Sequence, residues 1–285
     1  MQENKEIKAL LHLIDDPDED VYLTVSRHIL SLGKSIIPDL EHLWEIESNE
    51  FTQERIEQLI HRLHYEDLEK DFLTWKEEKN DLLTGAILAS RYHYPDVQPQ
   101  QIYNEIEKLK RNIWLELNNY LTPIEKVSVL NSILYNYFKL KAAPHDDNQP
   151  DSFLINKTLE NKSGNIFSNG ILYLALCEML DISVKAVNIP QQFLLAYFEE
   201  PHDPSLPLTR ILFYIDPNSG QLYSSKDVDN YLKKLTSPAD LEIFKPRNNT
   251  DVVATLLNEL SKCFDNDNNR YKMEELLLLA EKLGL

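Results

Sequence analysis

Apolar residues recur every three or four positions through the first part of the chain, which is the spacing of one face of an α-helix. This spacing predicts three short helices near the N-terminus and two more at about residues 51–63 and 66–78. The first three are defined by Ile7, Leu10, Leu11 and Ile14, by Val21, Val25, Ile29 and Leu32, and by Ile36, Ile37, Leu40 and Leu43. The N-terminal region is therefore expected to be helical almost throughout.

The helical period continues to about residue 140. Helices are predicted at about residues 80–92 and 98–119. A third begins at Thr122-Pro123-Ile124-Glu125, because this motif supplies an N-cap, a proline at the first helical position and a capping glutamate. The polar, proline-containing stretch at 142–151 predicts a loop.

After residue 182 the pattern changes to short runs rich in Val, Ile, Phe and Tyr. These predict strands at SVKAVNI, QFLLAYFE and RILFYID, and the turn Asp216-Pro217-Asn218-Ser219-Gly220 leads into a shorter strand at QLY. The result is a small antiparallel sheet. A helix then begins at Ser224 with capping-box spacing, and two final helices are expected at about 250–263 and 270–283.

Charge and glycine content exclude several classes of function. The 285 residues carry 29 basic and 47 acidic side chains, a net charge of −18, which disfavours nucleic acid and anionic membranes as partners. Residues 1–100 alone hold 22 acidic and 10 basic side chains. With only 6 glycines and no GxGxxG or GxxxxGK[ST] motif, the sequence does not predict a nucleotide cofactor site.

Compartment and redox chemistry follow from the two cysteines and the chain start. Cys177 and Cys263 lie in apolar helical patterns that favour buried thiols, as expected in a reducing, cytoplasmic setting. The first residues lack the basic region and apolar run of a secretory signal, and no stretch approaches 18 apolar residues. Cys177 is in the middle of a helical pattern, so it is interpreted as a core residue and not a nucleophile.

Three clusters resemble metal sites only superficially. The acidic run Asp16 to Asp20 and the run Asp265 to Asn269 both lack the glycine and glutamate that an EF-hand loop requires. His61 and His64 share a helix face, but no HExxH pattern or third ligand accompanies them. No metal and no cofactor are predicted; a metal protein centred on the two histidines is a minor alternative.

Two helical regions resemble repeat units. The segment 10–44, with its Asp-Pro-Asp turn, Val-rich second helix and Ile-Pro start of the next, resembles a HEAT-type repeat. The last two helices look like one tetratricopeptide-type hairpin. A unit of either kind buries its apolar face only against a neighbour.

The stretch from Asp151 to Gly220 resembles the SirB-like branch of the transglutaminase-like superfamily. The matching pieces are Asp151-Ser152-Phe153-Leu154, Leu159-Glu160, Gly164-Asn165, Ile171-Leu172-Tyr173-Leu174-Ala175, Val187-Asn188-Ile189-Pro190, Phe193-Leu194 and Ile215-Asp216-Pro217. The similarity extends from about residue 81 to 235. It implies a papain-like core, in which a helix packs against an antiparallel sheet.

The resemblance also implies where a catalytic triad would lie. In catalytic members a cysteine starts the helix, a histidine begins the next strand and an aspartate follows on the one after. Here those positions are assigned to Ser168, Gln192 and Asp216, and Gln191-Gln192 stands where the branch tends to have Gly-His. A carboxamide has no basic nitrogen near neutral pH, so Gln192 does not activate a hydroxyl. Alternatively, Ser168 is only a helix cap and Asp216 only a turn residue.

Taken together, the sequence predicts a mostly helical α+β protein with three regions. They are a HEAT-like region at 1–79, a transglutaminase-like domain at 80–240 and a helical hairpin at 241–285. The leading hypothesis is a non-catalytic interaction protein that binds another protein through its acidic N-terminal helices. The alternative is an acyl hydrolase or transferase that uses Ser168, with a base such as His145 or His202 supplied from a loop.

Overall fold

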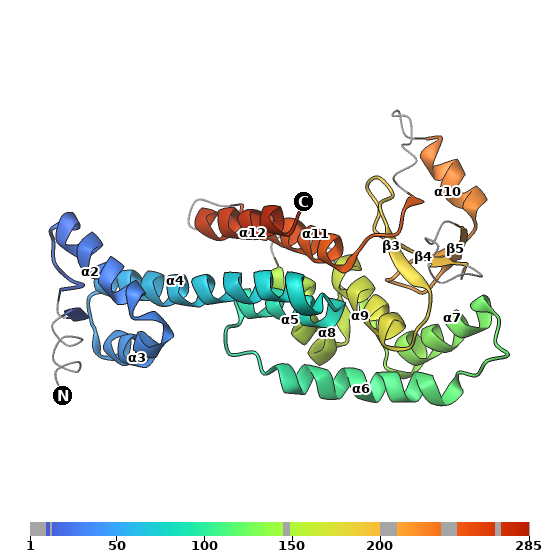
Figure 1. Ribbon diagram of the computed structural model, residues 1–285, viewed down its shortest axis with the longest axis horizontal. Coiled ribbons are helices and arrows are strands. Elements are labelled where there is room, and N and C mark those ends of the chain that lie inside the picture. The colour runs from blue at the N-terminus through green and yellow to red at the C-terminus, as the bar shows by residue number, and fades with distance from the viewer. Residues whose placement is uncertain are drawn as a thin grey trace. The chain divides into compact units, whose positions relative to one another are not determined.

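The computed structural model describes residues 10–11, 13–144, 149–199, 210–234, 244–265 and 269–284. The chain divides into two compact units, residues 1–71 and residues 72–285 (Figure 1). The boundary predicted at 79/80 therefore lies a few residues after the structural division. The hairpin predicted as a separate region at 241–285 belongs to the second unit.

The first unit is built from helices. They are α2 (Glu19–Ser31), a 3₁₀ turn (Gly33–Ile36), α3 (Ile37–Ile46) and the larger part of α4 (Glu50–Thr74). Its core consists of aliphatic side chains such as Ile14, Ile29, Leu40 and Ile56, none of which is exposed. Of the residues that define the first predicted helix, Leu10 and Leu11 are helical and Ile14 lies in a turn, whereas Ile7 is outside the described residues.

Arg55 of α4 fixes the turn before α2. Its Nη1 donates hydrogen bonds of 2.9 Å to the backbone carbonyls of Ile14 and Asp16. The guanidinium carbon lies 3.9 Å from the ring centroid of Tyr22 and 4.4 Å from that of Phe51. Only 6% of Arg55 is exposed, but its guanidinium donates to backbone carbonyls and contacts two aromatic rings. This charged residue is therefore a structural part of the helical core.

Helix α4 corrects one sequence prediction. The two helices expected at 51–63 and 66–78 form one continuous helix, Glu50–Thr74, followed by a π-helical turn at Trp75–Lys79. The junction Leu63-His64-Tyr65-Glu66 contains neither glycine nor proline, so nothing there interrupts the backbone hydrogen bonds.

The second unit combines helices with a four-stranded sheet and a separate two-stranded pairing. Its helices are α5 (Leu82–His93), α6 (Pro99–Glu116), α7 (Pro123–Asn131), α8 (Ile155–Asn161), α9 (Ile166–Met179), α10 (Ser225–Leu232), α11 (Asn249–Ser261) and α12 (Arg270–Leu283). The strands of the larger sheet are β3 (Val184–Val187), β4 (Leu194–Phe198), β5 (Ile211–Ile215) and β6 (Leu222–Tyr223), antiparallel in the order β3-β4-β5-β6. The mostly helical α+β class and the antiparallel sheet are confirmed.

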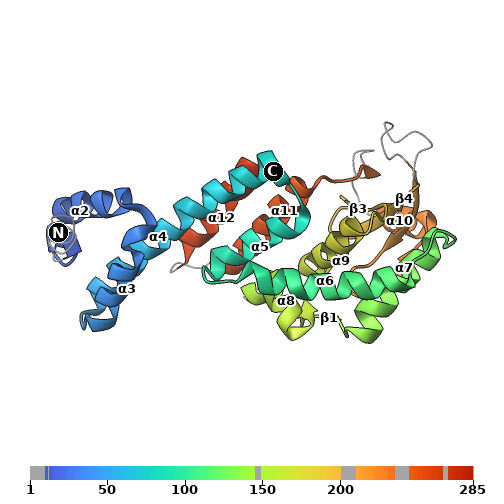
Figure 2. The ribbon, with the colours of Figure 1, turned by 60° about the horizontal axis from the view of Figure 1, so that its bottom comes forward.

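Helix α9 is the centre of this unit. Every residue from Ser168 to Cys177 is buried, and the helix contacts β3 and β4 on one side and α5, α6 and α8 on others (Figure 2). Because it is apolar around its whole circumference, it needs neighbours on all faces. The sheet and the surrounding helices supply them.

The C-terminal hairpin of α11 and α12 packs on α5. A Cβ added to Gly85 of α5 would lie 2.5 Å from the Trp75 ring and 2.7 Å from a Val253 methyl group, so glycine permits the close approach. At the other end of α5, the Tyr92 hydroxyl donates to a Glu275 carboxylate oxygen at 2.8 Å. The hairpin is thus integrated into the second unit. Its likeness to a tetratricopeptide unit, and that of 10–44 to a HEAT repeat, stay predictions.

Both ends of the loop predicted at 142–151 belong to regular elements. Its first residue belongs to β1 (Lys141–Ala142), which pairs in parallel with β2 (Ser163–Gly164), and a 3₁₀ turn occupies Pro150–Phe153. A two-residue pairing has no periodicity, which is why the sequence pattern did not indicate it. None of the helices in the described ranges is both long and apolar enough to span a membrane.

Candidate functional site

The start of α9 is the point where the resemblance locates a catalytic centre. Asn165 is the N-cap, and its Oδ1 accepts hydrogen bonds of 3.0 Å from the backbone N–H groups of Phe167 and Ser168. Ile166 is consequently the first helical residue. The positive end of the helix is thereby occupied by a side chain of the protein itself.

Ser168 is buried, with 1% of its surface exposed. Its Oγ donates to the backbone carbonyl of Ser152 at 2.7 Å and lies 3.3 Å from the carbonyl of Asn165. Gly164 packs directly behind the hydroxyl, because a Cβ at that position would overlap Ser168 Oγ. The hydroxyl proton is therefore held by a backbone carbonyl in a closely packed position.

Gln192 lies in a tight turn between β3 and β4. Its backbone N–H donates to the carbonyl of Ile189 at 3.0 Å, and Gln191 has a φ of 61°. That is the left-handed region in which glycine is favoured, and glycine is what the resembled branch tends to have there. In this chain a glutamine occupies the left-handed position.

Asp216 directly follows β5 and organises the next turn. Its Oδ1 accepts from the backbone N–H of Asn218 at 2.8 Å, and its Oδ2 accepts from the hydroxyl of Ser219 at 2.7 Å. The backbone N–H of Gly220 donates to the Asp216 carbonyl at 2.8 Å. The carboxylate is committed to this turn, as the interpretation of Asp216 as a turn residue expects.

A π-helical turn at Ser132–Tyr137 helps to hold the Asp216 turn in place. The Tyr135 hydroxyl donates to the Pro217 carbonyl at 2.8 Å, and Asn131, just before the π turn, donates from Nδ2 to the Gly220 carbonyl at 2.7 Å. Burial raises the pKa of the Tyr135 phenol well above its ordinary value, and Asp216 adds to this effect. Tyr135 is therefore neutral, as its donor role requires.

A cavity of about 400 Å³, called here the α9 cavity, lies beside these residues. It is lined by Ile166, Gln192 and Asp216, and by Leu194, Asn218, Tyr223, Asp227, Val228 and Tyr231. Ser168 is not in its lining. The structure thus brings Gln192 and Asp216 to one cavity, and the α9 residue beside them is Ile166.

Sequence reasoning missed Ile166. The signal was present, because an asparagine N-cap directly before an apolar run makes the next residue the first one of the helix. Since one helical turn takes 3.6 residues, a shift of two positions moves a side chain to almost the opposite face. This explains why Ser168 faces Ser152 and not the cavity.

A second cavity, of about 410 Å³, shares Ile166 and Gln192 with the α9 cavity. Its other lining residues include Arg247 and Lys262, whereas the α9 cavity has Asp216 and Asp227. Gln192 and Ile166 therefore border two cavities, one lined by two aspartates and the other by an arginine and a lysine. Neither hollow has a histidine or cysteine in its lining.

The remaining chemistry-bearing residues lie elsewhere. His145 and His202, the two alternative bases, are outside the described residues. Cys177 is completely buried, and burial raises the pKa of its thiol, which opposes thiolate formation. His61 and His64 lie on α4. Within the described ranges, no group of three or more His, Cys, Asp or Glu side chains is placed to hold a metal ion.

Comparison with known proteins supports the family resemblance that the sequence motifs indicate. Residues 100–258 match the family described as the transglutaminase-like superfamily. The chain is 27% identical to the protein YchA of Escherichia coli K12 over 208 residues, which are 72% of this chain and 73% of that protein. It is 25% identical to the protein SirB1 of Salmonella typhimurium over 205 residues, or 71% and 72% of the two chains. No solved structure matches.

Proposed function

The chain belongs to the transglutaminase-like superfamily, and from this premise we propose that it is a non-catalytic interaction protein whose transglutaminase-like domain has lost acyl-transfer chemistry. One observation carries the proposal. The Ser168 hydroxyl donates to the Ser152 carbonyl at 2.7 Å and lies outside the cavity that joins Gln192 and Asp216. A nucleophile has to reach the substrate and pass its proton to a base, and this hydroxyl does neither.

The cavity-lining residues support the same conclusion. Ile166, at the helix start, offers no nucleophilic atom, and the Gln192 carboxamide offers no basic nitrogen. Asp216, which would orient an imidazole in a triad, accepts hydrogen bonds from its own turn. Removal of the base from a triad leaves only about 10³- to 10⁴-fold catalysis, from binding and oxyanion stabilisation.

The acidic N-terminal helices are the proposed docking surface. Residues 1–100 hold 22 acidic and 10 basic side chains, and Asp15, Asp18 and Asp20 are exposed in the turn before α2 and at its first residues. Exposed charge of one sign steers the approach of a partner of opposite sign. The partner that fits is a protein with a basic surface.

Two assays test the loss of catalysis. Ester hydrolysis and amine incorporation into a glutamine-containing protein are measured with the full chain and with Ser168→Ala. We expect both proteins to give the rate of buffer alone. Turnover that depends on Ser168 would contradict the proposal and favour the hydrolase alternative.

Charge reversal tests the docking surface. Asp15→Lys combined with Asp20→Lys changes the charge without removing the Asp18 cap, whose side chain accepts from the Asp20 backbone N–H. Affinity capture by this variant is compared with capture by Glu274→Lys/Glu281→Lys, which makes the same charge change at exposed positions of α12, outside the N-terminal helices. We expect only the first variant, or high salt, to release the partner. Equal capture by both variants would count against docking at this surface.

A further inference from the structure

Two places where one helix ends and the next begins expose large apolar side chains. The first is called here the α3–α4 corner and comprises residues 39–57 of the first unit. The second is called the α6–α7 corner and comprises residues 108–126 of the second unit. Seven of the fourteen large apolar side chains that are exposed in the described residues lie at these corners, so both are candidate interaction surfaces. They are Trp44, Ile46 and Phe51 at the first corner and Trp114, Leu115, Tyr120 and Ile124 at the second.

The α3–α4 corner is acidic. Trp44 and Ile46 lie in the last turn of α3, and Phe51 is the second residue of α4. The corner contains seven acidic side chains and one basic side chain, and the basic one is buried in the core of the first unit. Glu45 directly precedes Ile46, and Glu54 lies one helical turn after Phe51. Both glutamates are exposed and form no ion pair with any described residue, so they remain available to a partner.

The α6–α7 corner exposes similar apolar groups with the opposite charge. Trp114 and Leu115 lie in the last turn of α6, and Tyr120 lies in the connection to α7, at one edge of the second unit (Figure 1). Their exposed fractions are 64%, 66% and 95%. The corner contains four basic and two acidic side chains, although the whole chain has a net charge of −18. Arg111, one helical turn before Trp114, and Lys126, in the first turn of α7, form no ion pair with any described residue.

The two corners complement each other in both apolar character and charge. Contact between them would remove aromatic and aliphatic side chains from water on both sides, which is favourable in proportion to the apolar area buried. The acidic rim of one corner would face the basic rim of the other, which favours encounter and fixes the orientation. Two α3–α4 corners, or two α6–α7 corners, would instead place like charges opposite each other. Charge therefore favours pairing of one corner with the other kind and not with its own kind.

We propose that the α3–α4 corner of one molecule binds the α6–α7 corner of a second copy of this chain. The apolar side chains form the centre of the interface, and the opposite charges of Glu45 and Glu54 and of Arg111 and Lys126 form its rim. Because two different surfaces meet, the contact is head-to-tail, and further copies add to it unless a ring closes. The inference rests on the proposed interaction role and names one partner for it, since the second copy supplies the basic surface.

Sedimentation velocity of the full chain over a concentration series tests self-association. At about 50 mM salt we expect the average mass to rise with protein concentration. At about 500 mM salt we expect it to fall toward the mass of the monomer, because salt screens exposed charges. A monomer at every concentration in low salt would overturn the proposal and leave the α6–α7 corner to a different protein. A rise in average mass that high salt leaves unchanged would overturn the role of charge in the contact.

Charge reversal locates the contact. Glu45→Lys/Glu54→Lys reverses charges at the acidic rim, and Arg111→Glu/Lys126→Glu reverses them at the basic rim. Each variant alone should self-associate about tenfold more weakly than the wild type, because each reversal removes an attraction and adds a repulsion. An equimolar mixture should associate again, because the unchanged corner of one variant meets the unchanged corner of the other. Failure of the mixture to associate, with wild-type urea midpoints for both variants, would overturn the proposal.

The matched control is Glu274→Lys/Glu281→Lys on α12. It makes the same change of net charge as Glu45→Lys/Glu54→Lys, at exposed positions outside both corners. Because a smaller net negative charge reduces general repulsion, this control should self-associate at least as strongly as the wild type. Equal self-association of the two Glu→Lys double variants would mean that the α3–α4 corner is not part of the interface, and would overturn the proposal.

The apolar centre of the interface is tested without any change of charge. Leu115→Ala removes part of an exposed side chain at the α6–α7 corner, and we expect self-association to weaken by about fivefold. Leu278→Ala makes the same substitution at an exposed position of α12 and should leave self-association unchanged. Equal affinities of the two leucine variants would overturn burial of the α6–α7 corner.

Failure of self-association is distinguishable from failure of the proposed function. A monomeric wild type whose captured partner is still released by Asp15→Lys/Asp20→Lys would keep the docking role and overturn only the second copy as a partner. Turnover that depends on Ser168 would contradict the non-catalytic role and would leave the sedimentation result unchanged.

Discussion

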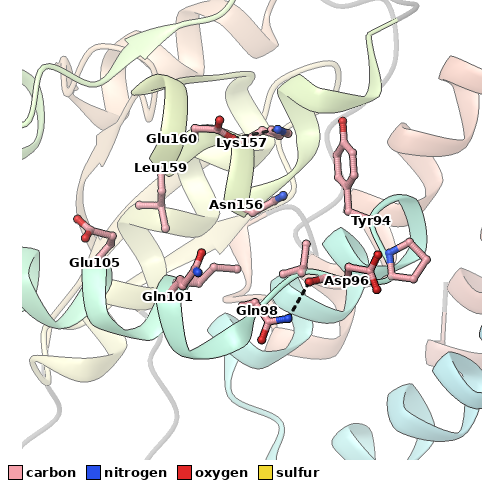
Figure 3. Close-up of a pocket in the computed structure, with 12 residues that line it drawn as sticks. Tyr94, Asp96, Gln98, Gln101, Glu105, Asn156, Lys157, Leu159 and Glu160 are labelled. Atoms are coloured by element: carbon pink, nitrogen blue, oxygen red, sulfur yellow. Dashed lines mark hydrogen bonds and ion pairs between the residues drawn. The ribbon is translucent and has the colours of Figure 1, made fainter.

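The α9 cavity and the cavity of about 560 Å³ between α6 and α8, called the α6–α8 cavity (Figure 3), differ in what their polar groups are bonded to. Around the α9 cavity the carboxylates accept hydrogen bonds within a turn and a helix cap. In the α6–α8 cavity, Glu105 and Glu160 form ion pairs with Lys108 and Lys157, and Asp96 is exposed. The polar groups of the α9 cavity therefore support the local backbone, whereas those of the α6–α8 cavity form side-chain ion pairs near solvent.

Three polar side chains that line the α9 cavity form hydrogen bonds within the protein. Asp227 accepts from the backbone N–H and the hydroxyl of Ser224 in a capping box, and Tyr231 donates from its hydroxyl to the Pro190 carbonyl at 3.0 Å. Asp216 accepts two hydrogen bonds from its own turn. A carboxylate that already accepts such bonds gains less from a ligand than one that accepts none. The presence of the α9 cavity therefore does not imply acyl-transfer chemistry.

The largest predicted effect is that of Gly164→Ala, which would break the packing at the start of α9. The added Cβ would overlap Ser168 Oγ and would lie 2.7 Å from Thr158 Oγ1 and 2.8 Å from Asn169 Oδ1. All three neighbours are buried, so the backbone has to shift. We expect the free energy of unfolding to fall by about 3 kcal/mol, the upper end for overpacking. Urea denaturation measures it.

The double variant Gly164→Ala/Ser168→Ala is the control. Removal of the hydroxyl relieves the worst overlap, so the double variant should be more stable than the sum of the two single effects predicts. Strict additivity would mean that the hydroxyl and residue 164 are not in contact. The proposed explanation of why Ser168 is inaccessible would then fail.

A second prediction restores chemistry to the α9 cavity. Ile166→Cys places a thiol at the first position of α9, beside Gln192 in the cavity lining. With Gln192→His added, a nearby imidazole should lower the pKa of that thiol. We expect alkylation by iodoacetamide near neutral pH to be faster in the double variant than in Ile166→Cys alone, on the order of tenfold. Mass spectrometry measures the labelled site.

The two native thiols serve as internal controls. Cys177 and Cys263 are buried and should stay unlabelled in both variants. The same pair made with Ser168→Cys in place of Ile166→Cys should show no acceleration, because position 168 is outside the cavity lining. Acceleration at 168 but not at 166 would restore the original assignment of the nucleophile position.

Local sequence signals predicted much of the fold. The Thr122 motif forms the expected capping box with Glu125, and Ser224 forms one with Asp227. The strands were predicted because β-branched and aromatic residues cluster between turn residues. Such features depend on residues within a few positions of one another, so a single sequence contains them. The family resemblance was likewise carried by short motifs in order.

The arrangement of the candidate site could be predicted less completely from the sequence. Gln192 and Asp216 were expected together, and they do line one cavity. Ser168 does not line that cavity, because the face that a residue of α9 occupies depends on where the helix begins, and boundaries are the least reliable part of a pattern-based prediction. The resemblance fixes the order of motifs along the chain but not the face of the helix that a given residue occupies.

The α6–α8 cavity was not predicted at all. Glu105 and Asn156 are far apart in sequence, and α8 itself was not assigned from the pattern. Amphipathic spacing predicts that one face of α6 is buried, but it does not tell which polar residues beside that face line a cavity with α8. That information exists only after the packing of α6 against α8 is known.

The smallest predicted effect concerns pH and the α6–α8 side of the second unit. His93 ends α5, and its ring lies 4.7 Å from the ring of Tyr94, which lines the cavity. Burial lowers the pKa of His93; Asp151 opposes this shift and Lys272 adds to it.

Because the pKa of His93 is lower in the folded state than in the unfolded state, the unfolded chain binds the proton more readily, and stability is lost as pH falls through the ordinary histidine range. The urea midpoint should therefore decrease from about pH 7.5 to about pH 5.5, and decrease less in His93→Gln. The control variant His42→Gln, at an exposed position of α3, should show the same decrease of the urea midpoint as the wild type. If His93→Gln also shows the full decrease, burial of His93 does not contribute to the loss of stability at low pH.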